Sequence, residues 1–364
     1  MNPGFSLYLD AVRFAAAVLV VLYHTNLRWL ISEPLPFAAY GHSAVVVFFV
    51  LSGYVISFVS SIKETSFEQF AVSRLARVYS VALPAVFLTP CLDLIGRSYY
   101  PLAYEGLAPV DWVAIRMLAS LSFTNELWTV SILSFSNTPY WSLCYEVWYY
   151  IIFAVVVYTT GVRRLLLLFT CTMIAGIKIL LLAPVWWMGV LLHRSGRMAR
   201  LLAYGGGWPA AIASILGIFA MHEFGVQAAL SNVLRNAIGE HLHTQLFLSK
   251  FFMSDMILGL LVMTHFGAVR AICNSRVDVV PMAFDRAIRA MAGYTFTLYL
   301  LHQPLFLFWG AMIRGNPQGT LFYGTTIFLL VASVILIGEL TEKRRGLIRG
   351  PAERLFSRVR LVFA

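Results

Sequence analysis

The chain has 364 residues, of which 60% are hydrophobic and 12% charged, and its formal net charge is +10. Soluble domains are typically about 45–50% apolar and about 25% charged, so this chain has too few polar residues to coat a water-soluble globule. The composition excludes a cytosolic enzyme, a disordered chain and a secreted scaffold, and it indicates an all-α, polytopic membrane helical bundle. The 4 cysteines form no CxxC pair, so neither a disulfide framework nor a metal site is expected.

Apolar runs separated by polar clusters, Gly and Pro predict about ten transmembrane helices of roughly 20 residues each. In chain order, the expected spans are 7–30, 43–61, 74–92, 139–160, 165–181, 183–193, 208–221, 250–267, 290–312 and 319–341. The stretch 109–125 carries Asp111 and Arg116 and is expected to lie at the membrane interface.

The distribution of basic residues predicts how the chain sits in the membrane. About ten crossings place both termini on one side, and most of the 27 lysines and arginines fall in the loops and tail on that side. Because basic loops stay inside, both termini are expected to be cytoplasmic. We expect a membrane-embedded domain over 1–342 and a basic cytoplasmic tail over 343–364, which contacts the lipid bilayer and not nucleic acid.

The first predicted span contains the ionisable residues Asp10, Arg13 and His24. At about 100° per residue, Arg13 and His24 share one helix face and lie roughly 16 Å apart along the axis. Charged groups are costly inside a bilayer, so both are functional candidates. The alternative is an arginine that extends to the headgroups and a core histidine bonded to a backbone carbonyl.

Five motifs in the chain resemble those of the acyltransferase-3 family. Arg13 and His24, with ten residues between them, are similar to its R-x10-H signature. The others are Phe48–Ile56 (FFVLSGYVI, like FFxxSG[FY]), Arg74–Tyr79 (like RRxxRIYP, with Ser80 in place of the proline), Trp141–Glu146 (like WSLxxE) and Tyr294–His302 (like Y-x-L-Y-L-x-H). The resemblance covers residues from about 7 to 340.

This resemblance implies a membrane-bound O-acyltransferase that moves an acyl group from cytoplasmic acyl-CoA to a sugar hydroxyl of a surface or lipid-linked polysaccharide. It implies acetyl-CoA as the donor substrate, no permanently bound cofactor, and a multi-pass location in the bacterial cytoplasmic membrane. It also implies the stand-alone form of the family, without an extra hydrolase-like domain. A transporter or flippase for a glycan or other solute is the alternative function, because intramembrane charges also mark translocation paths. A sensor or scaffold is a third hypothesis.

The depths of the charged residues suggest a two-ended site. Arg13, Arg74 and Arg77 are expected near the cytoplasmic ends of their spans, where guanidinium groups suit the phosphates of coenzyme A. Ordinary basic residues of the inner leaflet are the alternative. His24 and Glu146 are each expected roughly 10 Å below the outer boundary. We therefore predict a His–Glu pair in which the carboxylate fixes the imidazole tautomer and His24 accepts the proton of the acceptor hydroxyl. A structural carboxylate that caps or bridges helices is the alternative for Glu146.

Further residues are expected along the same path. Ser52 and Gly53 are predicted to let the pantetheine arm pass close to the backbone, with Ser52 as an oxyanion donor, unless they form a small-residue helix contact. Tyr140 and Trp141 are predicted to bind the acceptor by stacking on sugar rings, unless they belong to the aromatic belt of the membrane interface. His302 is predicted to line the same cavity or to be a satisfied core histidine. The sequence leaves open the acceptor, the hydroxyl modified, the acyl chain length, the oligomeric state and whether an acyl-enzyme forms.

Overall fold

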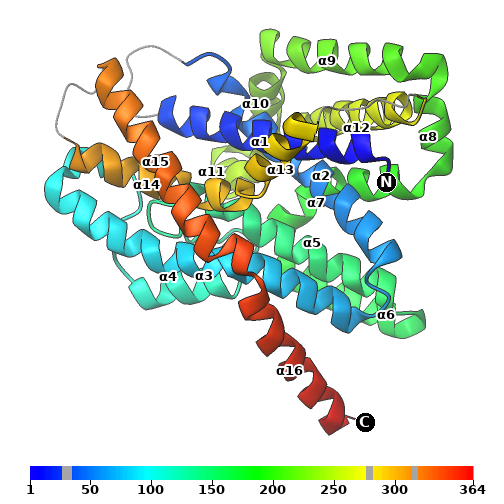
Figure 1. Cartoon of the computed structure of the whole chain (residues 1–364), viewed down its shortest axis with the longest axis horizontal. Helices are drawn as coiled ribbons and strands as arrows, with labels where there is room; N and C mark the ends of the chain where they lie inside the picture. The colour runs from blue at the N-terminus through cyan, green and yellow to red at the C-terminus, as the bar shows by residue number, and fades with distance from the viewer. Residues whose placement is uncertain (27–34, 276–281, 314–318, 364) are drawn as a thin grey trace.

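The computed structural model describes residues 1–26, 35–275, 282–313 and 319–363, and in these residues the fold is a helical bundle without strands (Figure 1). The prediction of an all-α bundle is confirmed. The helices are α1 (Pro3–Asn26), α2 (Gly41–Ile62), α3 (Phe67–Tyr99), α4 (Val113–Leu121), α5 (Trp141–Tyr158), α6 (Gly161–Ala175), α7 (Ile177–Arg194), α8 (Gly196–Leu202), α9 (Trp208–Glu223), α10 (Val226–Ile238), α11 (Glu240–Gln245), α12 (Phe252–Ser275), α13 (Met282–Ala292), α14 (Thr295–Met312), α15 (Thr320–Leu340) and α16 (Gly346–Phe363).

Within the described residues, 7 helices are long and apolar enough to cross a membrane, or 8 if the bent pair α9–α10 forms one span. The protein is therefore a multi-pass membrane protein. Two predicted spans fall outside this set: α6, which has 15 residues, and α14, which has 18. At about 1.5 Å per residue, α6 is shorter than the roughly 30 Å hydrocarbon core. The expected end of the first span, from 27 to 30, lies outside the described residues.

The boundary between the fifth and sixth predicted spans is wrong. The sequence pattern divides them next to Pro184, but the structure ends α6 at Ala175 and continues α7 straight through Pro184. The break lies at Gly176, whose φ is +76°, a conformation that favours glycine. A Cβ there would lie 2.6 Å from the Cα of Trp128, so the turn also needs the missing side chain for space.

The predicted span 290–312 is also divided into two helices. The structure ends α13 at Ala292 and begins α14 at Thr295, leaving Gly293 and Tyr294 between the two helices. The shorter α14 packs against α1, α3 and α15, which places it inside the bundle.

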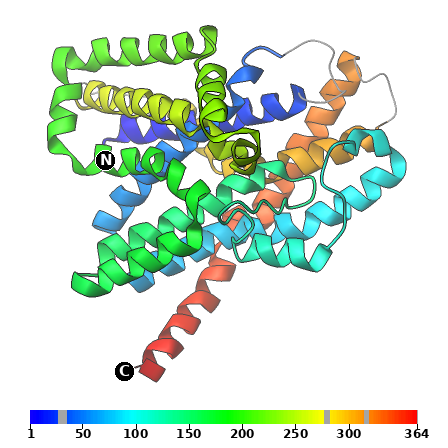
Figure 2. The same cartoon turned by 180° about the vertical axis from the view of Figure 1, so that it is seen from behind.

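The longest helix, α3, extends the predicted span 74–92 at both ends to 33 residues. The Ser66 Oγ caps its first turn by accepting a hydrogen bond from the Gln69 N–H at 3.2 Å. Pro84 and Pro90 lie inside the helix, as neighbouring helices permit in membrane proteins. Figures 1 and 2 show α3 running across the bundle, and it packs against α14 and α16.

Two glycines bring α2 and α7 into backbone contact. A Cβ on Gly53 would lie 2.0 Å from the carbonyl oxygen of Trp186, and one on Gly189 would lie 2.0 Å from the carbonyl oxygen of Val50. Gly53 therefore belongs to a small-residue helix contact, the alternative that the sequence left open, and the path predicted for pantetheine is not on its face of α2.

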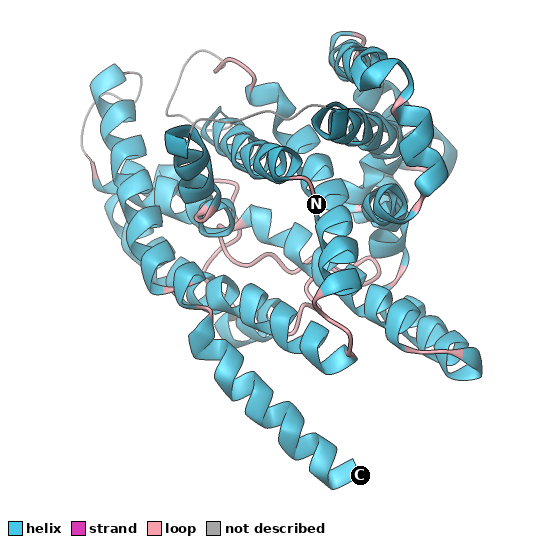
Figure 3. Ribbon diagram, turned by 45° about the vertical axis from the view of Figure 1, so that its right-hand side comes forward, coloured by secondary structure: helices cyan, strands magenta, loops and turns pink. Residues whose placement is uncertain are grey.

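The C-terminal segment is helical. After α15, a 3-10 turn over Glu342–Arg344 leads into α16, which packs against α3 and whose C-terminal end projects from the bundle (Figure 3). The turn itself remains against the bundle, so the first residues of the predicted tail belong to the membrane domain's surface.

Candidate active site

A cavity of about 550 Å³ lies between α1, α2, α3, α5, α14 and the turn that follows α15. It brings together five predicted site residues from four helices: Arg13, Ser52, Arg74, Arg77 and Glu146. The other polar residues of its lining are Ser142, Tyr150, Thr295, Tyr299, Glu342, Lys343 and Arg345. The cavity therefore joins Glu146 to the three arginines, whereas the sequence analysis expected Glu146 with His24 near the opposite end of the site.

The three arginines differ in their partners. Arg13 pairs with Asp10, one turn earlier on α1, with 3.4 Å between Nη1 and Oδ1. Arg74 pairs with the buried carboxylate of Glu64. Arg77 forms no ion pair with any residue that the structure describes, so its guanidinium is the most available of the three to an anion entering the cavity.

Glu146 is bound to hydroxyl groups, and the predicted pair with His24 is wrong. Its Oε1 accepts hydrogen bonds from the Oγ of Ser52 at 2.5 Å and from the hydroxyl of Tyr150, and within the described residues no hydrogen bond joins Glu146 to His24. Because a serine hydroxyl has one proton, Ser52 cannot also donate to an oxyanion while this bond is formed. Tyr150 was not predicted, although it lies four residues after Glu146 and hence on the same helix face.

His24 instead contacts His302. The Nδ1 of His24 lies 2.9 Å from the carbonyl oxygen of Val20 and 3.1 Å from the Nε2 of His302. The Nδ1 of His302 lies 2.8 Å from the carbonyl oxygen of Tyr299. A carbonyl oxygen only accepts, so each Nδ1 bears a proton in the neutral pair, and the single Nδ1–H of His24 is shared between the carbonyl oxygen of Val20 and the Nε2 of His302. This assignment leaves the lone pair of His24 on Nε2.

The histidine pair is separate from the cavity lining. His302 is 1% exposed and was expected to line the cavity, but it is a hydrogen-bonded core histidine, the other reading the sequence allowed. Tyr299 connects the two regions: it lines the cavity, and its ring centroid lies 6.3 Å from that of His302. Tyr299 therefore contacts both the cavity and the ring of His302.

Tyr140 and Trp141 are core residues, so the prediction that they stack on an acceptor sugar fails. Tyr140 is 1% exposed and donates a hydrogen bond to the carbonyl oxygen of Ser120, while Trp141 is 5% exposed and packs edge-on against Phe49 and Tyr145. Trp141 is the first residue of α5, and Tyr140 ends the connection before it.

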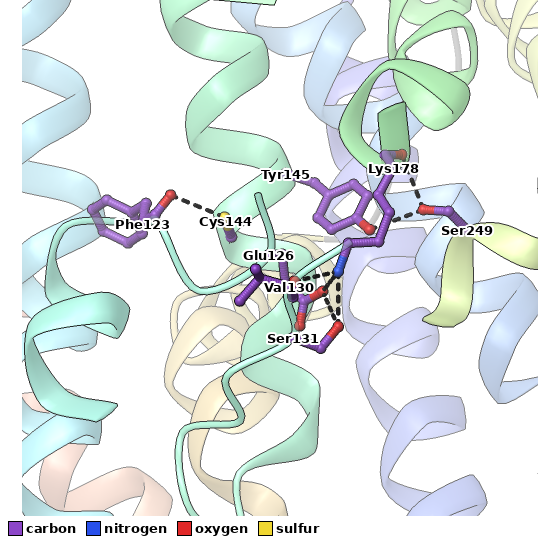
Figure 4. A network of polar contacts seen from close by, with 8 residues as sticks. All are labelled: Phe123, Glu126, Val130, Ser131, Cys144, Tyr145, Lys178 and Ser249. Atoms are coloured by element: carbon purple, nitrogen blue, oxygen red, sulfur yellow. Dashed lines mark hydrogen bonds and ion pairs between the residues drawn. The ribbon is translucent and has the colours of Figure 1, made fainter. Parts of the chain in front are cut away.

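That connection is held by a buried ion pair that the sequence analysis did not identify (Figure 4). The ammonium of Lys178 lies 2.6 Å from Glu126, 2.7 Å from the hydroxyl of Ser131 and 2.5 Å from the carbonyl oxygen of Val130. Both charged side chains are 0% exposed. Burial raises the pKa of the Glu126 carboxyl, and the Lys178 ammonium opposes that shift. The sequence did contain a signal for this ion pair, because Lys178 is a charged residue within the apolar run 165–181.

The same network continues to the helix that carries Glu146. The Tyr145 hydroxyl bonds Ser249 Oγ at 2.8 Å, and the thiol of Cys144 donates to the carbonyl oxygen of Phe123 at 3.0 Å (Figure 4). Cys144 is fully buried in this network, which gives it a structural role. The contacts fix the rotation of α5 immediately before Glu146.

A family model described as an acyltransferase domain matches residues 6–338. The chain belongs to the acyltransferase-3 family. The protein is therefore a membrane acyltransferase, and this membership favours the enzyme over the transporter. Neither a search of curated proteins nor one of solved structures found a match. Within the described residues, no group of three or more His, Cys, Asp or Glu side chains is placed to hold a metal ion.

Proposed function

We propose that the protein is an acyl-CoA-dependent O-acyltransferase that takes acetyl groups from acetyl-CoA. Its acceptor is a sugar hydroxyl of a surface or lipid-linked polysaccharide, and its location is the bacterial cytoplasmic membrane. The observation that supports this proposal most strongly is the shared cavity of Arg13, Arg77 and Glu146, with the His24–His302 pair next to it.

The donor suits the charges of this cavity. Coenzyme A carries a diphosphate and a 3′-phosphate, and guanidinium groups bind phosphate oxygens bidentately while remaining charged. Arg13 and His24 lie on one helix, roughly 16 Å apart along its axis. A nucleotide held by Arg13 and Arg77 would extend its pantetheine arm past Glu146 and Tyr299 toward the histidine pair. Glu146 would then contact the arm and would not orient His24.

The proposed reaction assigns one role to each histidine. The acceptor hydroxyl oxygen attacks the thioester carbonyl carbon, its proton moves to the Nε2 of His24, and the new C–O bond forms as the C–S bond breaks. The thiolate of coenzyme A leaves and receives that proton from the imidazolium. His302 is the positioning residue, because its Nε2 accepts from the Nδ1–H of His24 and stabilises the charged ring.

The test measures release of coenzyme A and acetyl transfer by purified protein in detergent with labelled acetyl-CoA. We expect His24→Ala to bind the donor while losing about 10²–10⁴-fold in turnover, the usual contribution of a general base. His241→Ala, at an exposed histidine of α11, is the matched control and should retain activity. Full turnover by His24→Ala, or no binding of acetyl-CoA by the wild type, would refute the proposal.

The acceptor is tested in cells. Deletion of the gene should remove acetyl esters from a surface polysaccharide, and wild type but not His24→Ala should restore them. Unchanged polysaccharide acetylation in the deletion strain would rule out this acceptor class.

A further inference from the structure

The turn after α15 forms one wall of the cavity. Glu342, Lys343 and Arg345 all line it. The Oε2 of Glu342 accepts hydrogen bonds from the N–H of Thr297 at 2.9 Å and from its hydroxyl at 2.8 Å. Thr297 lies in the first turn of α14, where unpaired N–H groups and the helix dipole favour a carboxylate. Glu342 therefore fixes the turn against the bundle and directs the following residues to the cavity.

The two basic residues of this wall differ in availability. The ammonium of Lys343 is bound to Glu339 and to the hydroxyl of Tyr294. Arg345 is exposed and forms no ion pair with a residue in the described part of the chain. Its neighbour Arg344 is also exposed but does not line the cavity. Arg345 thus adds a cation to the solvent-facing edge of a cavity that already contains Arg77.

The order of the chemical groups along the coenzyme A molecule determines which group lies at the solvent-facing edge of the cavity. The thioester and pantetheine enter first, the diphosphate follows, and the adenosine with its 3′-phosphate comes last. If the donor enters this cavity, which is the proposed function on which the inference rests, the deeper arginines meet the diphosphate. We propose that Arg345 binds the 3′-phosphate of coenzyme A. The C-terminal segment is then part of the donor site, although it lies beyond the residues 6–338 that the family model matches.

The test compares acetyl-CoA with 3′-dephospho-acetyl-CoA in steady-state kinetics of the full chain in detergent. A charge-assisted contact with phosphate is expected to change KM by about tenfold. Wild type should therefore prefer acetyl-CoA, and Arg345→Ala and Arg345→Gln should raise KM for acetyl-CoA about tenfold without changing KM for the dephospho donor. kcat should stay constant, because the contact is far from the thioester. Arg344→Ala is the matched control and should behave as wild type.

The outcomes separate this inference from the proposed function. An equal rise of KM for both donors, or no change for either, would overturn the 3′-phosphate contact while leaving the acyltransferase reaction intact. A wild type that binds and turns over neither donor would overturn the proposed function and this inference with it. Unfolding temperatures of both Arg345 variants equal to that of wild type would show that a change in KM reflects binding.

Discussion

Replacing Lys178 with methionine tests whether the buried ion pair holds the connection before α5. The substitution replaces the lysine stem with an unbranched apolar side chain of similar length and removes the ammonium group. It leaves the carboxylate of Glu126, which is 0% exposed, without its cation, and the carbonyl oxygen of Val130 without this donor. The hydroxyl of Ser131 loses one partner but keeps its bond to Glu126.

The expected cost follows from these lost contacts. Removing one partner of a buried ion pair typically costs about 3–5 kcal/mol, because the remaining charge is left without compensation. At roughly 2 °C per kcal/mol for a large domain, the unfolding temperature should fall by about 6–10 °C. In the double variant Glu126→Gln with Lys178→Met, no charge is left buried, so it should be more stable than Lys178→Met alone.

The assay is thermal unfolding of detergent-solubilised protein, followed by tryptophan fluorescence. Lys63→Met, at an exposed lysine after α2, is the control and should unfold at the wild-type temperature. A Lys178→Met protein as stable as this control would contradict the reasoning. A double variant less stable than the single one would do the same, because it would mean that charge burial is not the source of the cost.

Three further predictions concern the cavity and its supports. Arg77→Ala should raise KM for acetyl-CoA about tenfold in steady-state assays with little change in unfolding temperature. Arg74→Ala should mainly lower the unfolding temperature, because it breaks a buried ion pair. The reverse pattern would contradict the assignment of Arg77 to donor binding and of Arg74 to stability. His302→Ala should lower kcat about 10–100-fold and shift its pH profile at constant KM, because the Nδ1–H of His24 loses one of its two acceptors. An unchanged profile would exclude positioning. Gly53→Ala should cost about 1–3 kcal/mol in thermal unfolding, since its Cβ would lie 2.0 Å from a backbone oxygen, and wild-type stability would refute that contact.

The helices followed from composition and apolar runs, and their breaks were harder to predict. The expected ranges for α2 and α15 differ from the structure by one or two residues. At 165–193, the pattern divided the spans near Pro184 because proline lacks a donor, yet α7 continues through it. The true break at Gly176 depends on the close approach of Trp128, which is distant in the sequence.

The residues of the candidate site were predictable from the sequence, but their partners were not. Spacing along α1 put Arg13 and His24 on one face, and the motifs placed Arg74, Arg77 and Glu146 near that helix. Equal depth suggested that Glu146 would meet His24, but depth fixes a height in the membrane and leaves the rotation of α5 undetermined. The bonds of Glu146 to Ser52 and Tyr150 show that its carboxylate faces α2, whereas His24 faces α14.

The reciprocal contact of Gly53 and Gly189 has a mechanical consequence. Each glycine Cα faces a carbonyl oxygen of the other helix, so sliding α2 along α7 would drive side chains into backbone atoms. The two helices must therefore move as one body. Ser52, next to Gly53 on α2, lines the cavity. We therefore expect any widening of the cavity to come from movement of its other walls, which include α14 and the turn after α15.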